Sequence, residues 1–504
     1  MRYIKFIVIL LSSLFVLSCS KAERGEGSED DGLRLKDVIV NNVFARYDES
    51  KLLFDVLLPG VTDFTSIHLS YSAIAEEVLL NGEPFVYGSI VDATRPVTIT
   101  LVHGGEKKDY TLHVHNTGLP VVSIDTPSSA PIKSKDEWLE GARMTIRDKD
   151  GKLEYDGSLS IRGRGNSTWS YPKKPYALKL DEKSKILSMP SNKRWILLAN
   201  WKDRTLLRND AAFWLSSHSG LEYTVSGQFV ELMLNGKHQG NYYLCEQIKI
   251  GKNRVPIQEM DAFETDPEKI TGGYLLELDT YYDEPLRFRS PLNLPYQIKQ
   301  PEEDEISDEA YWYIRNYISE LESVLTDEER VLNHDYEEYI DVDSAIEYLI
   351  VQELTGNEDF YSTWPENGPH SCYVYKDRDG KLMHGPAWDF DYNTFMPTRS
   401  TWWQGATRTM YYPYLLKDDK FKQRLIEIWD ERKNEFKGLS EYLDKMTEYL
   451  ALSAGANHKM WPLGDQKQNG DEDLSFEYAV DRMKEGFEAK WNWMDRNISK
   501  ISVK

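Results

Sequence analysis

The sequence is poor in cysteine, in positive charge and in long apolar runs. Apart from Cys19, the only cysteines are Cys245 and Cys372; an oxidising compartment would permit one disulfide between them, and two buried free thiols fit the sequence at least as well. The formal net charge of −23 opposes unassisted binding to nucleic acid or anionic lipid head groups, since Lys and Arg supply most of that affinity. We therefore expect no nucleic-acid partner. Beyond the amino-terminal run, no apolar stretch is long enough to span a membrane.

The amino terminus has the pattern of an export signal. Arg2 and Lys5 precede or begin an apolar run over residues 6–17, which is too short to span a bilayer comfortably. The sequence Val16-Leu17-Ser18-Cys19 resembles the bacterial lipobox, in which the cysteine is acylated and becomes the first residue. We predict a signal peptide over residues 1–18 and a membrane anchor through a lipid on Cys19, with plain secretion as the alternative. The chain would then be exported and held in the bacterial envelope, at the outer membrane or cell surface.

A chain of 504 residues is too long for one ordinary domain and suggests two or three. Residues 19–32 are polar and acidic, and such a segment cannot bury enough apolar surface to order itself, so we predict a flexible tether. Residues 33–118 consist of short alternating runs broken by turn residues, which is typical of a small antiparallel β-sandwich of immunoglobulin-like type. This module holds no cluster of catalytic residue types, so we interpret it as a spacer or docking module. Residues 117–131, rich in Pro and Ser, are predicted as a linker.

We predict a mixed α+β domain over residues 119–400. We predict that residues 401–504 form a helical part packed on this domain. The predicted strands of the mixed domain are 158–161, 176–180, 194–198, 229–234, 242–248 and 274–278. A helix is predicted over 204–217, with Asp203 as its cap and Gly220 just past its end. The apolar periodicity predicts further helices over 309–325, 342–354 and 476–498.

The window from Ile161 to Asp210 reverses the charge of the chain. It contains twelve Lys and Arg against four acidic residues, a net charge of +8. A solvated face balanced by acids elsewhere is the simple interpretation, and a binding site for an anion is the alternative. The chain lacks the dinucleotide fingerprint, the Walker motif, the nucleophile elbow and zinc-binding motifs.

A glycine-containing turn stands at the start of this window, in Arg162-Gly-Arg-Gly-Asn-Ser-Thr-Trp169. Its glycines allow backbone amides to approach an anion closely, and arginine side chains can fork onto phosphate oxygens. Tyr176-Ala-Leu-Lys-Leu180 follows and puts Lys179 on the face opposite its apolar neighbours. A lysine in an apolar strand after a glycine turn is how kinase-like folds bring an ammonium to nucleotide phosphates. An edge-strand lysine that prevents aggregation is the structural alternative.

Two acidic sites follow much later in the chain. One is Gly356-Asn-Glu-Asp359, in a loop after a predicted helix, and the other is Gly385-Pro-Ala-Trp-Asp-Phe-Asp391, which carries Asp389 and Asp391 two residues apart. Carboxylate oxygens are the ligands that Mg²⁺ prefers, and a phosphoryl-transfer site needs one Asp to hold metal and another to orient the attacking hydroxyl. Single loop aspartates are mostly turn formers. The hypothesis of a phosphoryl-transfer site therefore rests on the order of four motifs, which are the glycine turn, the strand lysine and the two acidic sites.

Together these motifs resemble the spore coat protein H (CotH) kinase-like family. The resemblance spans roughly residues 121–395 and includes, besides the segments above, residues 195–209, Leu234-Asn-Gly236, Gly240-Asn-Tyr-Tyr-Leu-Cys-Glu-Gln-Ile248 and Gly272-Gly-Tyr-Leu-Leu-Glu277. It implies an atypical protein-kinase-like fold that binds ATP and Mg²⁺, or another divalent cation. The acceptor would be a Ser or Thr of an unidentified extracytoplasmic protein.

The resemblance also implies roles for particular residues. Asp359 would be the catalytic-loop aspartate, Asp389 the metal aspartate, and Lys179 the phosphate lysine with Lys174 as its rival. Glu246 would pair with that lysine or lie near the adenine. The remaining expected site residues are Arg162, Arg164, Asn166 and Ser167 for the nucleotide, and Asp391 and Asn367 for the metal. Asn367 enters because many family members carry an Asn where this sequence has Ser371.

A hypothesis of a different class is a catalytically inactive kinase-fold surface module that binds a glycan or a protein. It rests on the aromatic-rich loops with Trp364, Trp402, Trp403, Tyr411 and Tyr412, because aromatic rings beside polar groups suit sugar faces. Such residues are more often part of a core. Nucleotide binding separates the two hypotheses, because only an enzyme needs Asp389 together with Lys179.

Overall fold

The computed structural model describes residues 33–41, 43–58, 64–361, 369–502 and divides them into two compact units. The first comprises the described residues up to 56 and residues 65–113, and the second comprises the described residues of 57–64 and those from 114 onward. The predicted signal peptide, the tether, Cys19 and Asn367 lie outside the described residues. In the part of the chain that is described, no helix is long and apolar enough to cross a membrane.

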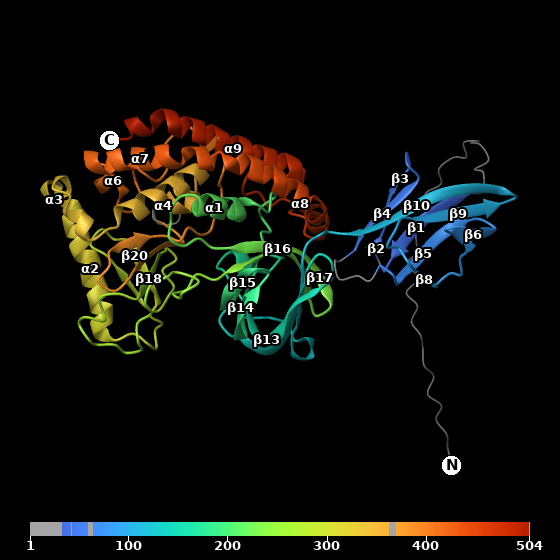
Figure 1. Ribbon diagram of the computed structural model, residues 1–504, viewed down its shortest axis with the longest axis horizontal. Helices are drawn as coiled ribbons and strands as arrows, with labels where there is room; N and C mark the ends of the chain where they lie inside the picture. The colour runs from blue at the N-terminus through green and yellow to red at the C-terminus, as the bar shows by residue number, and fades with distance from the viewer. Residues whose placement is uncertain (1–32, 42, 59–63, 362–368, 503–504) are drawn as a thin grey trace, which may run out of the picture. The chain divides into compact units, whose positions relative to one another are not determined.

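The amino-terminal unit consists of two antiparallel sheets (Figure 1). One sheet has the strand order β2-β1-β5-β8 and the other β3-β4-β10-β9-β6-β7. Residues in β4 alternate between buried and partly exposed positions, which is the period-2 pattern that predicted an all-β module here. The Tyr110 hydroxyl donates to the Leu33 carbonyl, 3.4 Å away. The strands are β1 (Arg34–Val40), β2 (Val43–Phe44), β3 (Arg46–Asp48), β4 (Leu53–Leu58), β5 (Ile67–Ile74), β6 (Glu77–Leu80), β7 (Glu83–Pro84), β8 (Ile90–Val91), β9 (Val97–His103) and β10 (Glu106–Asn116).

The second unit begins with a closed barrel whose strand order is β11-β12-β13-β14-β15-β17-β16. It closes through the parallel pairing of β11 with β16, and its interior is apolar. The predicted linker over 117–131 is therefore wrong in its centre, where Val121, Val122 and Ile124 are buried in β11; the flanking Pro and Ser concealed a short strand. The strands are β11 (Val121–Asp125), β12 (Leu139–Arg147), β13 (Leu153–Gly163), β14 (Tyr176–Ile186), β15 (Met189–Leu198), β16 (Gly227–Leu234) and β17 (Lys237–Glu246).

A five-stranded sheet and the helices complete the second unit. The sheet has the order β19-β20-β18-β21-β22, with β18 (Tyr274–Leu278), β19 (Arg287–Arg289), β20 (Pro295–Gln300), β21 (Cys372–Lys376) and β22 (Leu382–His384). The helices are α1 (Arg208–Ser217), α2 (Asp308–Thr326), α3 (Glu328–Leu332), α4 (Val342–Thr355), α5 (Glu358–Tyr361), α6 (Tyr412–Leu415), α7 (Asp419–Phe436), α8 (Gly438–Met460) and α9 (Phe476–Asn497). Figure 1 shows α7, α8 and α9 lying over α1 and α4. The mixed α+β class and the helical carboxy-terminal region are as predicted.

The first helix of the second unit starts later than its sequence pattern indicated. Asp203 does not cap it; its carboxylate accepts the backbone N–H groups of Thr205 and Arg208, both at 2.9 Å, and pairs with the buried Arg208 guanidinium. This side chain closes a turn over residues 203–207, in which Leu206 has φ 58°. α1 therefore begins only at Arg208.

The carboxy-terminal helices are tied to the mixed part of the second unit by buried polar contacts. Lys490 of α9 donates to Glu353 of α4 at 2.9 Å, and both side chains are nearly inaccessible to solvent. Lys173 donates to Asn457 of α8 at 2.8 Å, and burial lowers the pKa of this lysine to about 7. Because buried charges need partners, these helices form part of the same core.

Candidate functional site

A cavity of about 1070 Å³ lies in the second unit between the barrel and the five-stranded sheet. Its walls include Ala177, Ile196 and Leu198 from the barrel and Gln297 and Ile298 from the sheet. The sequence-predicted residues that line it are Arg162, Arg164, Asn166, Ser167, Asp359, Asp389 and Asp391. The fold thus brings the glycine turn and both acidic sites to one cavity, although almost 200 residues separate them in the chain.

The glycine turn connects β13 to β14 at one wall of the cavity. A Cβ on Gly163 would lie 2.4 Å from the Trp169 ring, so only glycine fits there. Gly165 has φ +83°, and a Cβ would meet the Thr168 hydroxyl at 2.0 Å. Backbone in the left-handed region favours glycine, and the turn is packed so closely at both positions that a Cβ would not fit. The local packing of the turn therefore requires glycine at both positions.

The two arginines of this turn have different surroundings. The Arg162 guanidinium lies over the Trp138 ring at 4.6 Å and donates to the Asp136 carbonyl at 3.2 Å. The Arg164 guanidinium lies 5.4 Å from the centre of the Trp388 ring, directly before Asp389. Arg164 therefore carries positive charge from the glycine turn to the acidic wall of the cavity.

Three carboxylates form that acidic wall. Burial and the charge of Asp389 raise the pKa of Asp359 well above its usual range. Burial also raises the pKa of Asp389, and burial together with Asp389 raises the pKa of Asp391 to about 8. The charge of Arg164 opposes the increase at Asp389 and Asp391. Crowded carboxylates of this kind resist ionisation unless a cation joins them.

The oxygen donors of this wall suit a hard divalent cation such as Mg²⁺. Asp389 and Asp391 are the residues that would hold it, and Asp359 lines the same cavity. Asp389 has φ 65°, a left-handed backbone conformation that non-glycine residues seldom adopt and that is enriched at functional sites. The donor set therefore fits the metal that the sequence pattern implied.

Asn357 holds both acidic segments together. Its Oδ1 accepts the backbone N–H of Asp359 at 3.1 Å, and its Nδ2 donates to the Asp389 carbonyl at 3.4 Å and to Gln352 at 3.0 Å. The side chain is 2% exposed, so water cannot replace these bonds. Sequence reasoning missed this role, although Asn357 stands inside the Gly356-Asn-Glu-Asp359 motif.

A second missed group lies at the end of β18. Asp279 accepts the Ser371 backbone N–H at 3.3 Å and contacts His370 Nδ1 at 3.3 Å. The Ser371 hydroxyl in turn donates to Asp389 at 3.3 Å, and all four residues line the cavity. Ser371 thus contacts the expected metal aspartate directly. The only sequence signal for Asp279 was its position two residues after the Gly272–Glu277 motif.

The two expected phosphate lysines, Lys179 and Lys174, and Glu246 are placed differently from the three aspartates of the acidic wall. Lys179 is exposed on the same face of β14 as Ala177, opposite the buried Leu178 and Leu180, and it does not line the cavity. Lys174 donates to the Trp169 carbonyl at 2.6 Å. The buried Glu246 pairs with Arg254 at 2.5 Å and also accepts from Tyr223 and the Ser226 N–H.

Lys299 of β20 is a cavity-lining lysine that sequence reasoning did not find. Its ammonium lies 3.2 Å from Glu277 and also contacts Glu284. Burial disfavours the charged form, but the two glutamates outweigh burial and raise the pKa of Lys299. Lys299 therefore stays protonated and supplies a fixed positive charge in the cavity wall.

Neither remaining cysteine is paired. Cys245 and Cys372 are both buried and free, and burial raises the pKa of each thiol. The two-thiol alternative left open by the sequence is the one observed.

Fold and site define a mixed α+β protein whose described residues enclose a cavity with a basic glycine turn on one wall and a carboxylate cluster on another. The family model described as CotH kinase protein matches residues 161–493. The chain belongs to the CotH kinase family, as the sequence motifs indicated.

Two further comparisons with known proteins give no evidence about the function of this chain. A crystal structure of a Bacteroides thetaiotaomicron protein, provisionally described as a glycoside hydrolase, is 17% identical with a TM-score of 0.15; the match covers 34% of this chain and 53% of that one. The matched part thus spans about half the length of that protein, and at this TM-score the likeness supports no conclusion about fold or activity. The search of curated proteins found no match.

Proposed function

We propose that this protein is a phosphotransferase that binds ATP with Mg²⁺ and phosphorylates Ser or Thr residues of an extracytoplasmic protein. The observation that carries the proposal is the cavity that Arg164 of the glycine turn lines together with Asp359, Asp389 and Asp391. Membership in the CotH kinase family supports it. Phosphoryl transfer depends mostly on positioning and charge neutralisation, and the charged residues that line this cavity are suited to both.

The roles follow from the chemistry of each group. Bound Mg²⁺ neutralises charge on the phosphates. Arg162 and Arg164 bind phosphate oxygens, and Lys299 adds a further positive charge. The acceptor hydroxyl oxygen forms a bond to the γ-phosphorus, the bond from that phosphorus to the bridging oxygen of ADP breaks, and Asp359 takes the hydroxyl proton. To take this proton Asp359 must be ionised, which a bound cation would favour, and its raised pKa then makes it a stronger base than an ordinary aspartate.

The test is nucleotide binding by the full chain. We expect millimolar ATP with Mg²⁺ to raise the melting temperature, because a ligand that binds only the folded state stabilises it. Asp389→Asn should abolish the metal-dependent part of this rise, whereas Asp156→Asn, at an ion pair with Arg143 on the barrel, should preserve it. Absence of any shift in the unaltered chain would refute the proposal.

Transfer requires its own measurement. Label from [γ-³²P]ATP should enter the chain itself or a generic acceptor such as casein, and Asp359→Asn should remove this incorporation while nucleotide binding persists. Nucleotide binding without transfer would contradict the proposed catalysis, and the absence of both binding and transfer would favour the catalytically inactive surface module. Of the aromatic residues behind that module, Tyr411 and Tyr412 are fully buried and bonded to Glu322 and the Ala345 carbonyl, so neither offers a sugar platform.

Export and lipid anchoring belong to the same proposal. The lipobox-like sequence ending at Cys19 supports an acylated cysteine in the envelope, with the acceptor protein on the same side of the membrane. Cys19→Ser should move the protein from the membrane fraction to the soluble fraction of fractionated cells. Unchanged membrane association of this variant would exclude the lipid on Cys19 as the anchor.

A further inference from the structure

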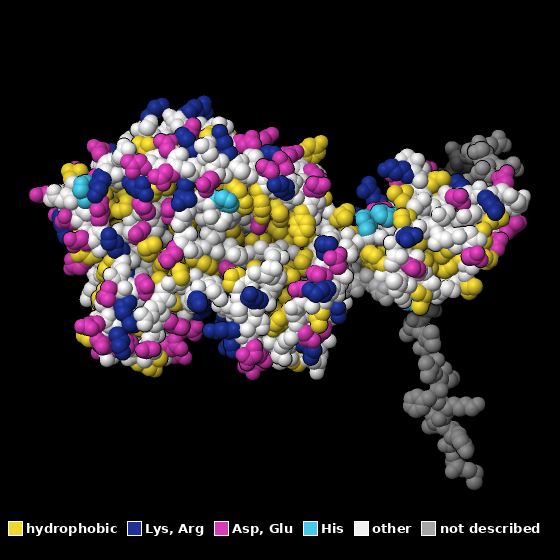
Figure 2. Space-filling view, in the orientation of Figure 1, with side chains coloured by type: hydrophobic (Ala, Val, Ile, Leu, Met, Phe, Trp, Pro, Cys, Tyr) yellow, Lys and Arg dark blue, Asp and Glu magenta, His cyan; other side chains and the backbone are white. Residues whose placement is uncertain are grey.

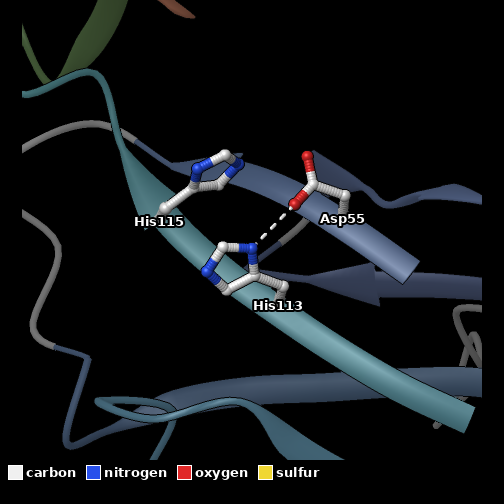
Figure 3. Close-up of side chains that lie close together, drawn as sticks. All are labelled: Asp55, His113 and His115. Carbon is white, nitrogen blue, oxygen red and sulfur yellow. Dashed lines mark hydrogen bonds and ion pairs between the residues drawn. The ribbon is translucent and has the colours of Figure 1, made fainter. Parts of the chain in front are cut away.

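Two histidines and an aspartate lie close together on the neighbouring strands β4 and β10 of the six-stranded sheet (Figure 3). They are Asp55, His113 and His115, and none of them lines the cavity described above. One ligand atom from each side chain lies within 4.8 Å of the others. The proposed kinase activity has no use for these residues, so their proximity asks for a separate explanation.

Strand geometry creates the cluster. His113 and His115 are two residues apart on β10, and residues at this spacing project from the same face of a sheet. The Thr111 N–H donates to the Leu52 carbonyl at 2.9 Å, which pairs β10 with the segment leading into β4. Asp55 follows on β4, and His113 Nδ1 lies 3.2 Å from its Oδ1.

The donor types match a borderline divalent metal. Zn²⁺ takes imidazole nitrogens and carboxylate oxygens at about 2.0–2.2 Å in a tetrahedral shell, which separates neighbouring ligand atoms by roughly 3.3 Å. The contact between His113 and Asp55 already has this spacing, and binding would require the His115 side chain to turn so that its nitrogen comes to the same spacing. Mg²⁺ and Ca²⁺ prefer all-oxygen sites, so a set with two imidazoles discriminates against them.

Solvent can reach the cluster. The His113 and Asp55 side chains are 46% and 37% exposed, so an ion can enter without any opening of the fold. Among the described residues these three supply ligand atoms that lie close together, and zinc sites built on three protein ligands of these types are an established arrangement. We propose that Asp55, His113 and His115 form a zinc-binding site on the adjacent strands β4 and β10.

The experiment is isothermal titration of the full chain, free of any polyhistidine tag, with Zn²⁺ in excess Mg²⁺. The excess Mg²⁺ is included to compete with Zn²⁺ for the carboxylate wall of the cavity, whose oxygen donors suit Mg²⁺. We expect one Zn²⁺ per chain, and at least tenfold weaker binding in His113→Ala/His115→Ala. Asp55→Asn is close to isosteric and should weaken binding as well, which guards against misfolding of the double variant.

Two control variants locate the site. His103→Ala removes a partly exposed histidine of the same sheet, which lies 3.7 Å from Glu76, and it should leave Zn²⁺ affinity unchanged. Asp389→Asn should also leave it unchanged, so the failure of the proposed nucleotide site cannot be mistaken for the failure of this one. Equal Zn²⁺ affinity in the unaltered chain and in both cluster variants would overturn the proposal. So would the absence of any binding below about 100 μM Zn²⁺, which corresponds to less than about 5.5 kcal/mol.

Discussion

The Arg164 guanidinium lies over the Trp388 ring at 5.4 Å, so the glycine turn contacts the residue directly before Asp389. This contact links the glycine turn to the acidic wall of the cavity, and the two segments lie more than 200 residues apart in the sequence. A cation over an indole face contributes about 0.5–2 kcal/mol. It also holds positive charge beside carboxylates that would otherwise repel each other.

Arg164→Ala should therefore weaken binding of ATP with Mg²⁺ at least tenfold, which is about 1.4 kcal/mol, as measured by isothermal titration. Arg164→Lys keeps the charge but loses the planar contact with Trp388, so we expect an intermediate affinity. Arg143→Ala is the matched control, because Arg143 lies on the same barrel in an exposed ion pair with Asp156. An equal loss in Arg143→Ala would contradict a specific role for Arg164.

The carboxylate wall predicts how stability depends on pH. The pKa of Asp391 is raised to about 8, and that of an unfolded Asp is about 3.9. The folded chain therefore binds more protons than the unfolded chain between these values, and the free energy of unfolding falls as the pH rises from about 4 to 8. We expect the metal-free chain to melt at a lower temperature at pH 8 than at pH 6.

Asp391→Asn isolates this effect from the other titrating groups. The melting temperature of the variant minus that of the unaltered chain should increase between pH 6 and pH 8, and Mg²⁺ should reduce the increase by binding the ionised carboxylates. Differential scanning fluorimetry at both pH values provides the measurement. A difference that stays constant with pH would mean that Asp391 ionises normally.

The ion pair between Lys490 and Glu353 should contribute strongly to the free energy of unfolding. Lys490→Met leaves a buried glutamate without its charged partner, and breaking one side of such a pair costs about 3–5 kcal/mol. We expect a loss toward the lower end, about 3 kcal/mol, because three backbone N–H groups also donate to Glu353. Urea denaturation measures it.

Lys484→Met is the control for that variant. Lys484 lies on the same helix and pairs at 2.7 Å with Asp444, whose side chain is 62% exposed. An ion pair with an exposed partner contributes about 0–1 kcal/mol. If both lysine variants lost the same free energy of unfolding, the buried ion pair would contribute no more to stability than the exposed one.

Two glycine substitutions should act in opposite directions. Gly163→Ala drives a Cβ into the Trp169 ring and should destabilise the chain by about 1–3 kcal/mol, with loss of nucleotide binding. Gly455 lies inside α8 with nothing within 4 Å of an added Cβ, so Gly455→Ala should stabilise by about 0.5–1 kcal/mol. Urea denaturation of both variants tests the pair, and a stabilising Gly163→Ala would disprove the close packing of the turn.

The thiols provide a simple check of burial. Cys245 and Cys372 are free and about 0–1% exposed, and a buried thiol with a raised pKa reacts slowly because the thiolate is the reactive form. A thiol reagent such as DTNB should label neither cysteine in the native chain and both in 6 M guanidinium chloride. Rapid labelling before denaturation would show that one of these segments opens.

The sequence by itself was sufficient for the features that depend on local order along the chain. The apolar periodicities predicted α2, α4 and α9 within a residue or two of their observed bounds, because each helix buries one stripe of its own surface. The family followed from several short motifs in a fixed order, and the glycine turn and the later aspartates were recognised because each motif is contiguous.

Only the tertiary structure decided which distant residues meet. Strand pairing set Lys299 beside Glu277, and Asn357 bridges two acidic segments 30 residues apart; neither contact leaves a periodic signal in the chain. Asp203 closed a turn where a helix cap was expected, because its carboxylate also met Arg208. Asp55 and His113 are 58 residues apart, and they become neighbours only because β4 and β10 lie side by side. Contacts of this kind come from packing between elements, which local sequence does not encode.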